Sequence, residues 1–241
     1  MKTALVTGAS RGIGKAIALR LAADGFAVIV HCAGNTEKAD QVVEQIRQNG
    51  GRASRLQCDL RDLQQVQRLH GQTGDVDVLV LNASVQYKTP WQQISVDACM
   101  EQLCCNFVAS MLLIQQYAGH MQAQKWGRIV AIGSVQEAKP HPDMLVYSAS
   151  KAAQTNMVRS LAQQLAPFGI TVNNVAPGVI ATDRNAEALS DPCYAKQVAD
   201  SIPMGFYGEP QDLAGILSLL VSEEGRYITG QSIYVDGGKC L

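Results

Sequence analysis

Short apolar runs alternate with amphipathic stretches along nearly the whole chain. The runs predict buried strands at 3–7, 27–30, 53–58, 76–81, 129–132, 170–175 and 232–235. Between them, apolar residues recur at helical spacing, which predicts helices at 15–23, 37–49, 63–70, 96–124, 147–166 and 210–221. Strands of this kind alternating with helices are typical of a parallel sheet covered on both faces. The pattern therefore predicts an α/β fold, a doubly wound parallel sheet of Rossmann type with about seven strands.

The chain shows no sign of division into parts. We find no internal repeat, low-complexity segment or Pro- or Ser-rich linker, so we expect one domain over 1–241, with a substrate lid at about 181–207. Apolar residues make up 47% of the chain and charged residues only 17%, below the usual quarter. Much of the surface is therefore expected to be buried, either in the core or against other subunits.

Charge and cysteine content exclude several classes of protein. The net charge is −1 without a basic stripe, which argues against nucleic acid or an anionic membrane as partner. The start of the chain is too interrupted for a signal peptide, and no apolar run approaches the ~20 residues of a membrane span. The seven cysteines form no C-x-x-C pair, and the four histidines lack metal-ligand spacing. We expect a cytoplasmic protein with reduced thiols and no metal.

A glycine-rich turn joins the first strand to the first helix. Gly8, Gly12 and Gly14 stand between an apolar strand and a helix, the context that makes a glycine pattern indicate a nucleotide site. Glycines let the backbone approach a pyrophosphate, and the helix N-terminus offers free N–H groups. Further polar or turn residues follow later strands, at Asp59, Asn82, Ser134 and 177–178. Because ligands of such sheets bind beyond the carboxyl ends of the strands, these residues are expected to converge on one edge.

Tyr147 and Lys151 are four residues apart on a predicted helix, so their side chains share one face. A free tyrosine has a pKa near ~10, and a nearby ammonium favours its phenolate and eases proton exchange. Ser134 ends the fifth apolar run, where its hydroxyl can hold a carbonyl oxygen opposite Tyr147. This arrangement predicts proton transfer between Tyr147 and a carbonyl or hydroxyl oxygen of a substrate.

With both motifs in place, the chain closely resembles the short-chain dehydrogenase/reductase family over nearly all its length. Cys58-Asp59-Leu60, Asn82-Ala83, Asn106, Pro177-Gly178 and Tyr234-Val-Asp-Gly-Gly238 also stand in the family's order and spacing. The chain departs from the family at Leu81, which costs a polar contact of the sheet, and at Ser84, which replaces a glycine beside the substrate space.

The resemblance implies a role for each site residue. Tyr147 exchanges the proton with the substrate oxygen, Ser134 hydrogen-bonds that oxygen, and Lys151 lowers the tyrosine pKa and holds the nicotinamide ribose. Asn106 supports a water that links Lys151 to solvent. Asp59 meets the adenine, Asn82 and Ala83 line the ribose side, and 177–182 close over the nicotinamide. The expected catalytic residues are Asn106, Ser134, Tyr147 and Lys151, and the expected substrate contacts are Ser84, Ser134, Gln136 and Tyr147. The expected cofactor contacts are Gly8, Ser10, Arg11, Gly12, Ile13, Gly14, His31, Asn35, Asp59, Leu60, Asn82, Ala83, Tyr147, Lys151, Pro177, Gly178, Ile180 and Thr182.

NADP is favoured over NAD. An NAD site places an acid about 20 residues beyond the glycines, but no carboxylate follows the second strand until Glu37. Arg11, inside the glycine turn, can reach a 2′-phosphate, and His31 or Asn35 can add hydrogen bonds.

Three readings of the substrate stay open. The glycine turn and length most resemble a reductase of 3-oxoacyl thioesters, whose members present arginines to an acyl carrier protein. Lys125 and Arg128 fit that description, whereas Phe168 stands where an arginine is expected. A sugar or polyol dehydrogenase is the second reading, because Gln136, Glu137, Lys139 and His141 predict a polar wall after Ser134. The third is a nucleotide-binding scaffold without chemistry, which the complete set of four catalytic residues disfavours.

The helices at 96–124 and 147–166 carry apolar residues on more than one face. The family commonly pairs these two helices across a two-fold axis. We therefore expect a homotetramer in which these helices make an isologous contact. The expected substrate is a small carbonyl or alcohol compound.

Overall fold

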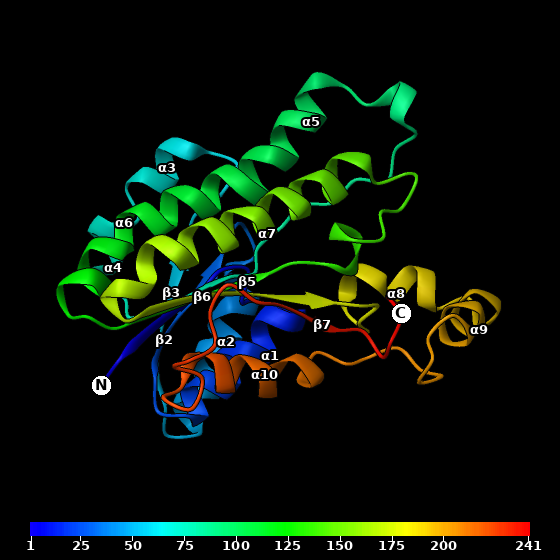
Figure 1. Ribbon diagram of the computed structural model, residues 1–241. Coiled ribbons are helices and arrows are strands. Elements are labelled where there is room, and N and C mark those ends of the chain that lie inside the picture. The colour runs from blue at the N-terminus through cyan, green and yellow to red at the C-terminus, as the bar shows by residue number, and fades with distance from the viewer.

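A computed structural model describes residues 1–241 and shows one parallel sheet with helices on both faces (Figure 1). The seven strands lie in the order β3-β2-β1-β4-β5-β6-β7. Between β1 and β4 the order of the strands reverses, which is the switch point where doubly wound sheets bind ligands. The strands are β1 (Thr3–Val6), β2 (Ala27–Cys32), β3 (Arg52–Gln57), β4 (Val78–Leu81), β5 (Gly127–Ile132), β6 (Ile170–Pro177) and β7 (Ser232–Val235).

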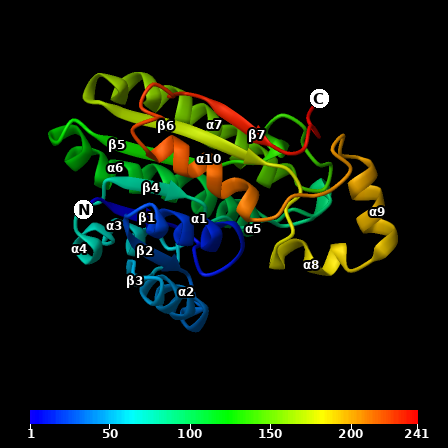
Figure 2. The same cartoon turned by 90° about the horizontal axis from the view of Figure 1, so that it is seen from below.

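Helices cover the two faces of the sheet separately (Figures 1 and 2). One face carries α1 (Gly12–Ala23), α2 (Thr36–Gln48) and α10 (Gln211–Val221). The other carries α3 (Leu63–Gln67), α4 (His70–Thr73), α5 (Val96–Leu103), α6 (Ala109–Ala123) and α7 (Leu145–Leu165). The short helices α8 (Asp183–Leu189) and α9 (Pro192–Asp200) lie beyond the end of the sheet. The fold class predicted from the sequence is confirmed.

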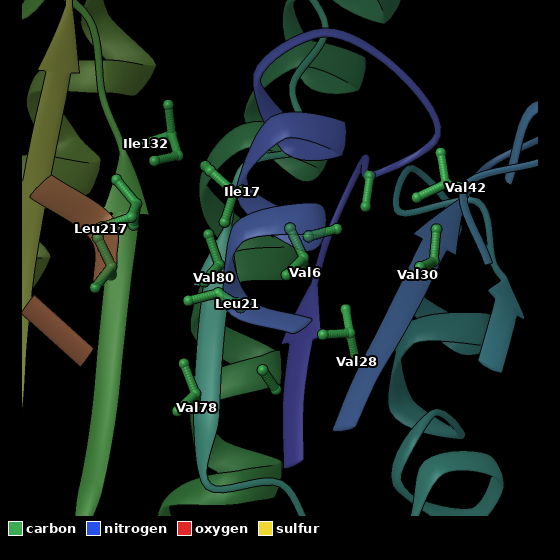
Figure 3. Close-up of a cluster of buried hydrophobic side chains, with 14 of the residues drawn as sticks. Val6, Ile17, Leu21, Val28, Val30, Val42, Val78, Val80, Ile132 and Leu217 are labelled. Atoms are coloured by element: carbon green, nitrogen blue, oxygen red, sulfur yellow. The ribbon is translucent and has the colours of Figure 1, made fainter. Parts of the chain in front are cut away.

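Each face of the sheet has its own hydrophobic core. Because side chains alternate along a strand, Val6, Val30 and Val80 point to the α1 face, where they pack with Ile17 and Leu217 (Figure 3). Their strand neighbours point to the other face, where Leu113, Tyr117, Met121 and Val158 pack on them. Full burial of an aliphatic side chain contributes about 1.5–3 kcal/mol, so the two cores hold both helical layers in place.

The predicted strands and helices are all present, with shifted ends and two subdivisions. The helix predicted at 96–124 consists of α5, a π-helical turn at Cys104–Val108, and α6. The helix predicted at 63–70 is divided into α3, which starts after its Asp62 cap and ends at Gln67, and α4, which starts at His70. The region of the predicted lid contains α8 and α9.

The helical stretch Val96–Ala123 is long and apolar enough to cross a membrane by length and composition alone, which differs from the sequence-based expectation. Within the fold it packs on the sheet, since Leu113, Tyr117 and Met121 are completely buried. A helix that is apolar on several sides can be a core helix as well as a span. Here its inner face belongs to the core of the domain.

Candidate active site

A large cleft of about 940 Å³ opens along the carboxyl edge of the sheet. This volume is at the upper end of the range of about 300–1,000 Å³ found for ligand pockets. All the predicted site residues line it except Asn106, which lies behind its wall. The elements that supply the lining are far apart in sequence and meet because parallel strands end at the same edge.

The glycine turn forms one end of the cleft. Gly8 and Gly12 have positive φ angles of 64° and 54°, which favour glycine. A Cβ on Gly14 would collide with the carbonyl oxygen of Gly8. Helix α1 starts after Arg11 without a side-chain cap or an acidic residue in its first turn. Its first N–H groups are therefore open to an anion such as a pyrophosphate.

Asn82 holds the glycine turn from the end of β4. Its side-chain amide donates to the carbonyl oxygens of Thr7 (2.8 Å) and Gly8 (3.1 Å). The Thr7 hydroxyl oxygen in turn accepts from the N–H groups of Asn82 (2.9 Å) and Ala83 (3.0 Å). The polar group of Asn82 thus shapes the turn, in addition to lining the cleft as predicted.

His31 has a different role from the one that the sequence suggested. Its Nδ1 accepts from the Gly8 N–H (3.0 Å) and its Nε2 lies 2.9 Å from the Cys58 carbonyl oxygen, to which it donates. Burial lowers the pKa of this imidazole to about 4, so the ring is neutral at pH 7. With both ring nitrogens engaged, His31 has no group left for a 2′-phosphate. It ties the glycine turn to the end of β3.

Cations gather where β2 ends. Lys38 Nζ and Arg11 Nη1 lie 3.1 Å and 3.6 Å from the same carboxylate oxygen of Asp183. Asn35 accepts from the Lys38 N–H and caps α2. No carboxylate follows β2 at the place where an NAD site would have one.

Asp59 is the other charged residue at the adenosine end. Its carboxylate binds Arg61 at 2.6 Å, and this partner holds the Asp59 pKa below its usual value.

Tyr147 and Lys151 are both buried on α7, 5% and 1% exposed, and face the cleft as the four-residue spacing predicted. Lys151 Nζ donates to the Ile132 carbonyl oxygen (2.6 Å) and to Gln154 Oε1 (3.1 Å), and lies 5.8 Å from the centre of the Tyr147 ring. Burial lowers the pKa of Lys151 to about 7.

The groups that shift the pKa of Tyr147 differ from those expected from the sequence. Burial raises its pKa, and the charge of Arg184 together with hydrogen bonding to Ser134 opposes that rise. Lys151 is not among the groups that lower it. Ser134 lies beside the phenol as predicted, and its hydroxyl oxygen also accepts from the Gln136 N–H (3.2 Å).

Asn106 lies in the π-helical turn and is completely buried. Its amide oxygen accepts from the Val85 N–H and its amide nitrogen donates to the Val85 carbonyl oxygen, both at 2.9 Å. The same nitrogen donates to Ser150 Oγ at 3.0 Å. Asn106 therefore fastens the loop after β4, which lines the cleft, to the helix that carries Tyr147.

Arg184, on α8, is the main site residue that we did not predict. Its guanidinium donates to the carbonyl oxygen (2.8 Å) and the hydroxyl (3.2 Å) of Ser84, in the loop after β4. The segment 181–207, predicted as a lid, has no pattern that points to a ligand. An arginine two residues after Thr182 was the one available signal.

The predicted polar wall after Ser134 is only partly present. Gln136, Lys139 and His141 line the cleft, but Glu137 does not. The Glu137 carboxylate turns into the protein and accepts from Thr155 Oγ1 (2.7 Å) and Asn174 Nδ2 (2.9 Å).

Lys125 and Arg128 lie at the wrong edge for a carrier-protein contact beside the cleft. Lys125 precedes β5 and Arg128 is at its start, whereas the cleft lies beyond its end. Arg128 is 1% exposed and donates to the carbonyl oxygens of Gly127 (2.9 Å) and Gly169 (3.3 Å). These two residues are not part of the mouth of the cleft.

Comparison with known proteins agrees with this geometry. The model of the family described as short chain dehydrogenase matches residues 2–192. The chain belongs to this family. The chain is 38% identical to the 3-oxoacyl-[acyl-carrier-protein] reductase FabG of Staphylococcus aureus, over 98% of this chain and 97% of the relative.

Solved structures give the same result. A 3-oxoacyl (acyl-carrier-protein) reductase from Agrobacterium tumefaciens C58 with NADP bound is 36% identical, with a TM-score of 0.95 and coverage of 98% and 93%. A gluconate 5-dehydrogenase from Burkholderia cenocepacia J2315 in complex with NADP and tartrate is 30% identical, with a TM-score of 0.91 and coverage of 99% and 94%. The predicted family and its oxidoreductase class are confirmed. The similar structures include one enzyme of each predicted type, a 3-oxoacyl reductase and a sugar-acid dehydrogenase.

Proposed function

We propose that this short-chain dehydrogenase interconverts a ketone and a secondary alcohol with NADP, and that Tyr147 transfers the proton. The observation that carries the proposal is the placement of a buried phenol beside Ser134 in the cleft that begins at the glycine turn. The two hydroxyls can hold one substrate oxygen between them. In reduction Tyr147 gives that oxygen a proton, and in oxidation it takes the proton back.

The cleft fits the cofactor at both ends. The uncapped start of α1 suits the pyrophosphate. Arg11 in the glycine turn and Lys38 on α2 both contact Asp183, and they could bind a 2′-phosphate in its place. Bound NADPH supplies a hydride to the carbonyl carbon, and NADP⁺ accepts it in the reverse direction. We assign Lys151 to the nicotinamide ribose, at the same end of the cleft as Tyr147. The two NADP-bound neighbours support this choice over NAD.

Two substrate classes deserve testing. The similarity to FabG supports a 3-oxoacyl thioester or another small carbonyl compound. The absence of Lys125 and Arg128 from the mouth of the cleft removes the support that these residues gave to a carrier protein. The alternative, a sugar or polyol dehydrogenase, is supported by the polar lining from Gln136, Lys139 and His141 and by the gluconate 5-dehydrogenase neighbour.

The test is NADPH and NADH oxidation by the purified protein with 3-oxoacyl thioesters, ketoses and diketones, and reduction of NADP⁺ with polyols. Tyr147→Phe keeps the ring and removes the proton donor, so we expect turnover to fall by about 10²–10⁴-fold with an unchanged fold. Circular dichroism and NADPH binding serve as controls for folding. Near-normal turnover by Tyr147→Phe, or no turnover of the whole panel by the wild type, contradicts the proposal.

We also propose that residues 1–241 act as one domain with a lid at 181–207, in a cytoplasmic homotetramer. All seven cysteines are free, which suits a reducing compartment. Met100 on α5 and Leu145 on α7 are 51% and 52% exposed, and Val96 is 77% exposed, so the two helices present apolar surface that an isologous contact would cover. Light scattering at micromolar concentration tests the mass, and a fully active monomer contradicts the assembly.

A further inference from the structure

Arg184 is a cation in the cleft for which the fold provides no carboxylate partner. It forms no ion pair, and its hydrogen bonds go to neutral oxygens, those of Ser84 and the phenol of Tyr147. The neighbouring Asp183 is already shared by Arg11 and Lys38. The guanidinium lines the cleft, and arginine is the side chain best suited to bind a carboxylate through two parallel N–H groups, so the position of Arg184 points to an anionic ligand.

The charges around Arg184 have the same sign. Beyond the cofactor end, the cleft is lined by Lys88, Lys139 and Lys239 in addition to Arg184. The only carboxylates that line the cleft are Asp59 and Asp183, and both are engaged with basic residues near the adenosine end. The substrate end of the cleft is thus positive without a compensating acid.

We propose that Arg184 binds a carboxylate of the substrate, so that the natural substrate is a small oxo acid or hydroxy acid. The inference rests on the proposed function and names the substrate class of the same site. A guanidinium offers two parallel N–H groups that match the two oxygens of a carboxylate, and such a pair is stronger than its bonds to Ser84.

The position of Arg184 also limits where the carboxylate stands in the substrate. The guanidinium lies close enough to the phenol to oppose the rise in the Tyr147 pKa, and Tyr147 marks the place of the reacting oxygen. The carboxylate must therefore be a few bonds away from the reacting carbon. A neutral acyl chain in this position would make no charge-assisted hydrogen bond with Arg184.

The experiment compares acids with neutral counterparts of the same carbon skeleton. Gluconate and glucitol are tested with NADP⁺, and 3-oxobutanoate and its methyl ester are tested with NADPH. We expect kcat/KM for at least one acid to exceed that for its neutral partner by tenfold or more. Binding of the same compounds to the NADPH complex, measured by calorimetry, tests recognition independently of turnover.

Arg184→Gln removes the charge and keeps a polar side chain. We expect it to weaken the binding of the preferred acid to the NADPH complex by about 10–100-fold, the range for a charge-assisted hydrogen bond, and to change the binding of the neutral partner less than threefold. Arg68→Gln is the matched control, because it removes the same charge from an exposed position at the end of α3 that does not line the cleft. Its kinetics should equal those of the wild type.

Three results overturn the inference. One is a panel in which no acid exceeds its neutral partner in turnover or binding. Another is an equal loss for acid and neutral compound in Arg184→Gln. The last is a weaker affinity of Arg184→Gln for NADPH itself, measured by fluorescence, which would assign Arg184 to the cofactor. Turnover of neutral ketones without preference for acids refutes only the carboxylate, whereas no turnover of any carbonyl compound refutes the proposed function as well.

Discussion

The buried imidazole of His31 makes the stability of this protein depend on pH in a way that can be calculated. Its ordinary pKa is 6.5 and burial lowers it to about 4 in the folded protein. Because the folded pKa is depressed, the folded state resists a proton that the unfolded chain accepts. The stabilisation from neutral His31 is complete above pH 6.5 and is lost as the pH falls from 6.5 through 4.

The magnitude follows from the difference between the two pKa values. The free energy of unfolding should fall by about 1.4 kcal/mol per pH unit within this window, and by about 2 kcal/mol between pH 7.5 and pH 5. Protonation at Nδ1 also removes the acceptor for the Gly8 N–H, so the glycine turn loses its anchor to β2. NADPH binding by the folded protein should therefore weaken only as the pH approaches 4, where the folded protein itself takes up this proton.

The assay is urea unfolding of the wild type and of His31→Gln at pH 7.5, 6 and 5, at one fixed protomer concentration. Gln offers an amide that can donate to the Cys58 carbonyl and does not titrate. The lowered pKa of Lys151 affects both proteins alike and cancels in the difference. We expect the advantage of the wild type over His31→Gln to shrink by about 2 kcal/mol between pH 7.5 and 5. A difference that stays constant with pH would show that His31 is not held neutral by the fold.

Two further predictions test the cofactor site and the loop after β4. Arg11→Ala should raise the KM for NADPH by about 10–100-fold and leave that for NADH nearly unchanged, since only NADPH carries the 2′-phosphate; equal effects would place Arg11 on a part that both cofactors share. Asn106→Leu leaves the Val85 N–H and carbonyl without their partners, so it should destabilise the fold by about 1–3 kcal/mol and speed hydrogen exchange at Val85. Unchanged exchange at Val85 in this variant would contradict the fastening role of Asn106.

The sequence predicted those parts of the molecule that depend on local pattern. Apolar runs predicted the seven strands. The glycines predicted the turn, because its backbone has positive φ angles at Gly8 and Gly12, which favour glycine. Tyr147 and Lys151 followed from helical spacing. Each of these features depends on residues close together in the chain.

What the sequence left undetermined depends on the direction of individual side chains and on distant partners. The imidazole of His31 and the carboxylate of Glu137 are polar groups at strand ends that turn into the protein, and only their partners on other strands decide this. Arg184 reaches Ser84 from 100 residues away. The error at Arg128 was avoidable, because a residue before an apolar strand lies at the opposite edge from one after it.

The π-helical turn at Cys104–Val108 limits which insertions and deletions the sequence tolerates between α5 and α6. Such a turn holds one residue more than an α-helical turn, so it sets the rotational phase of α5 relative to α6. Deleting one of its residues would restore regular backbone bonding and give a better helix. The same deletion would turn Gln102, which accepts from the Tyr87 N–H, by about 100° away from the loop that it holds. Insertions and deletions between α5 and α6 should therefore be rare across relatives.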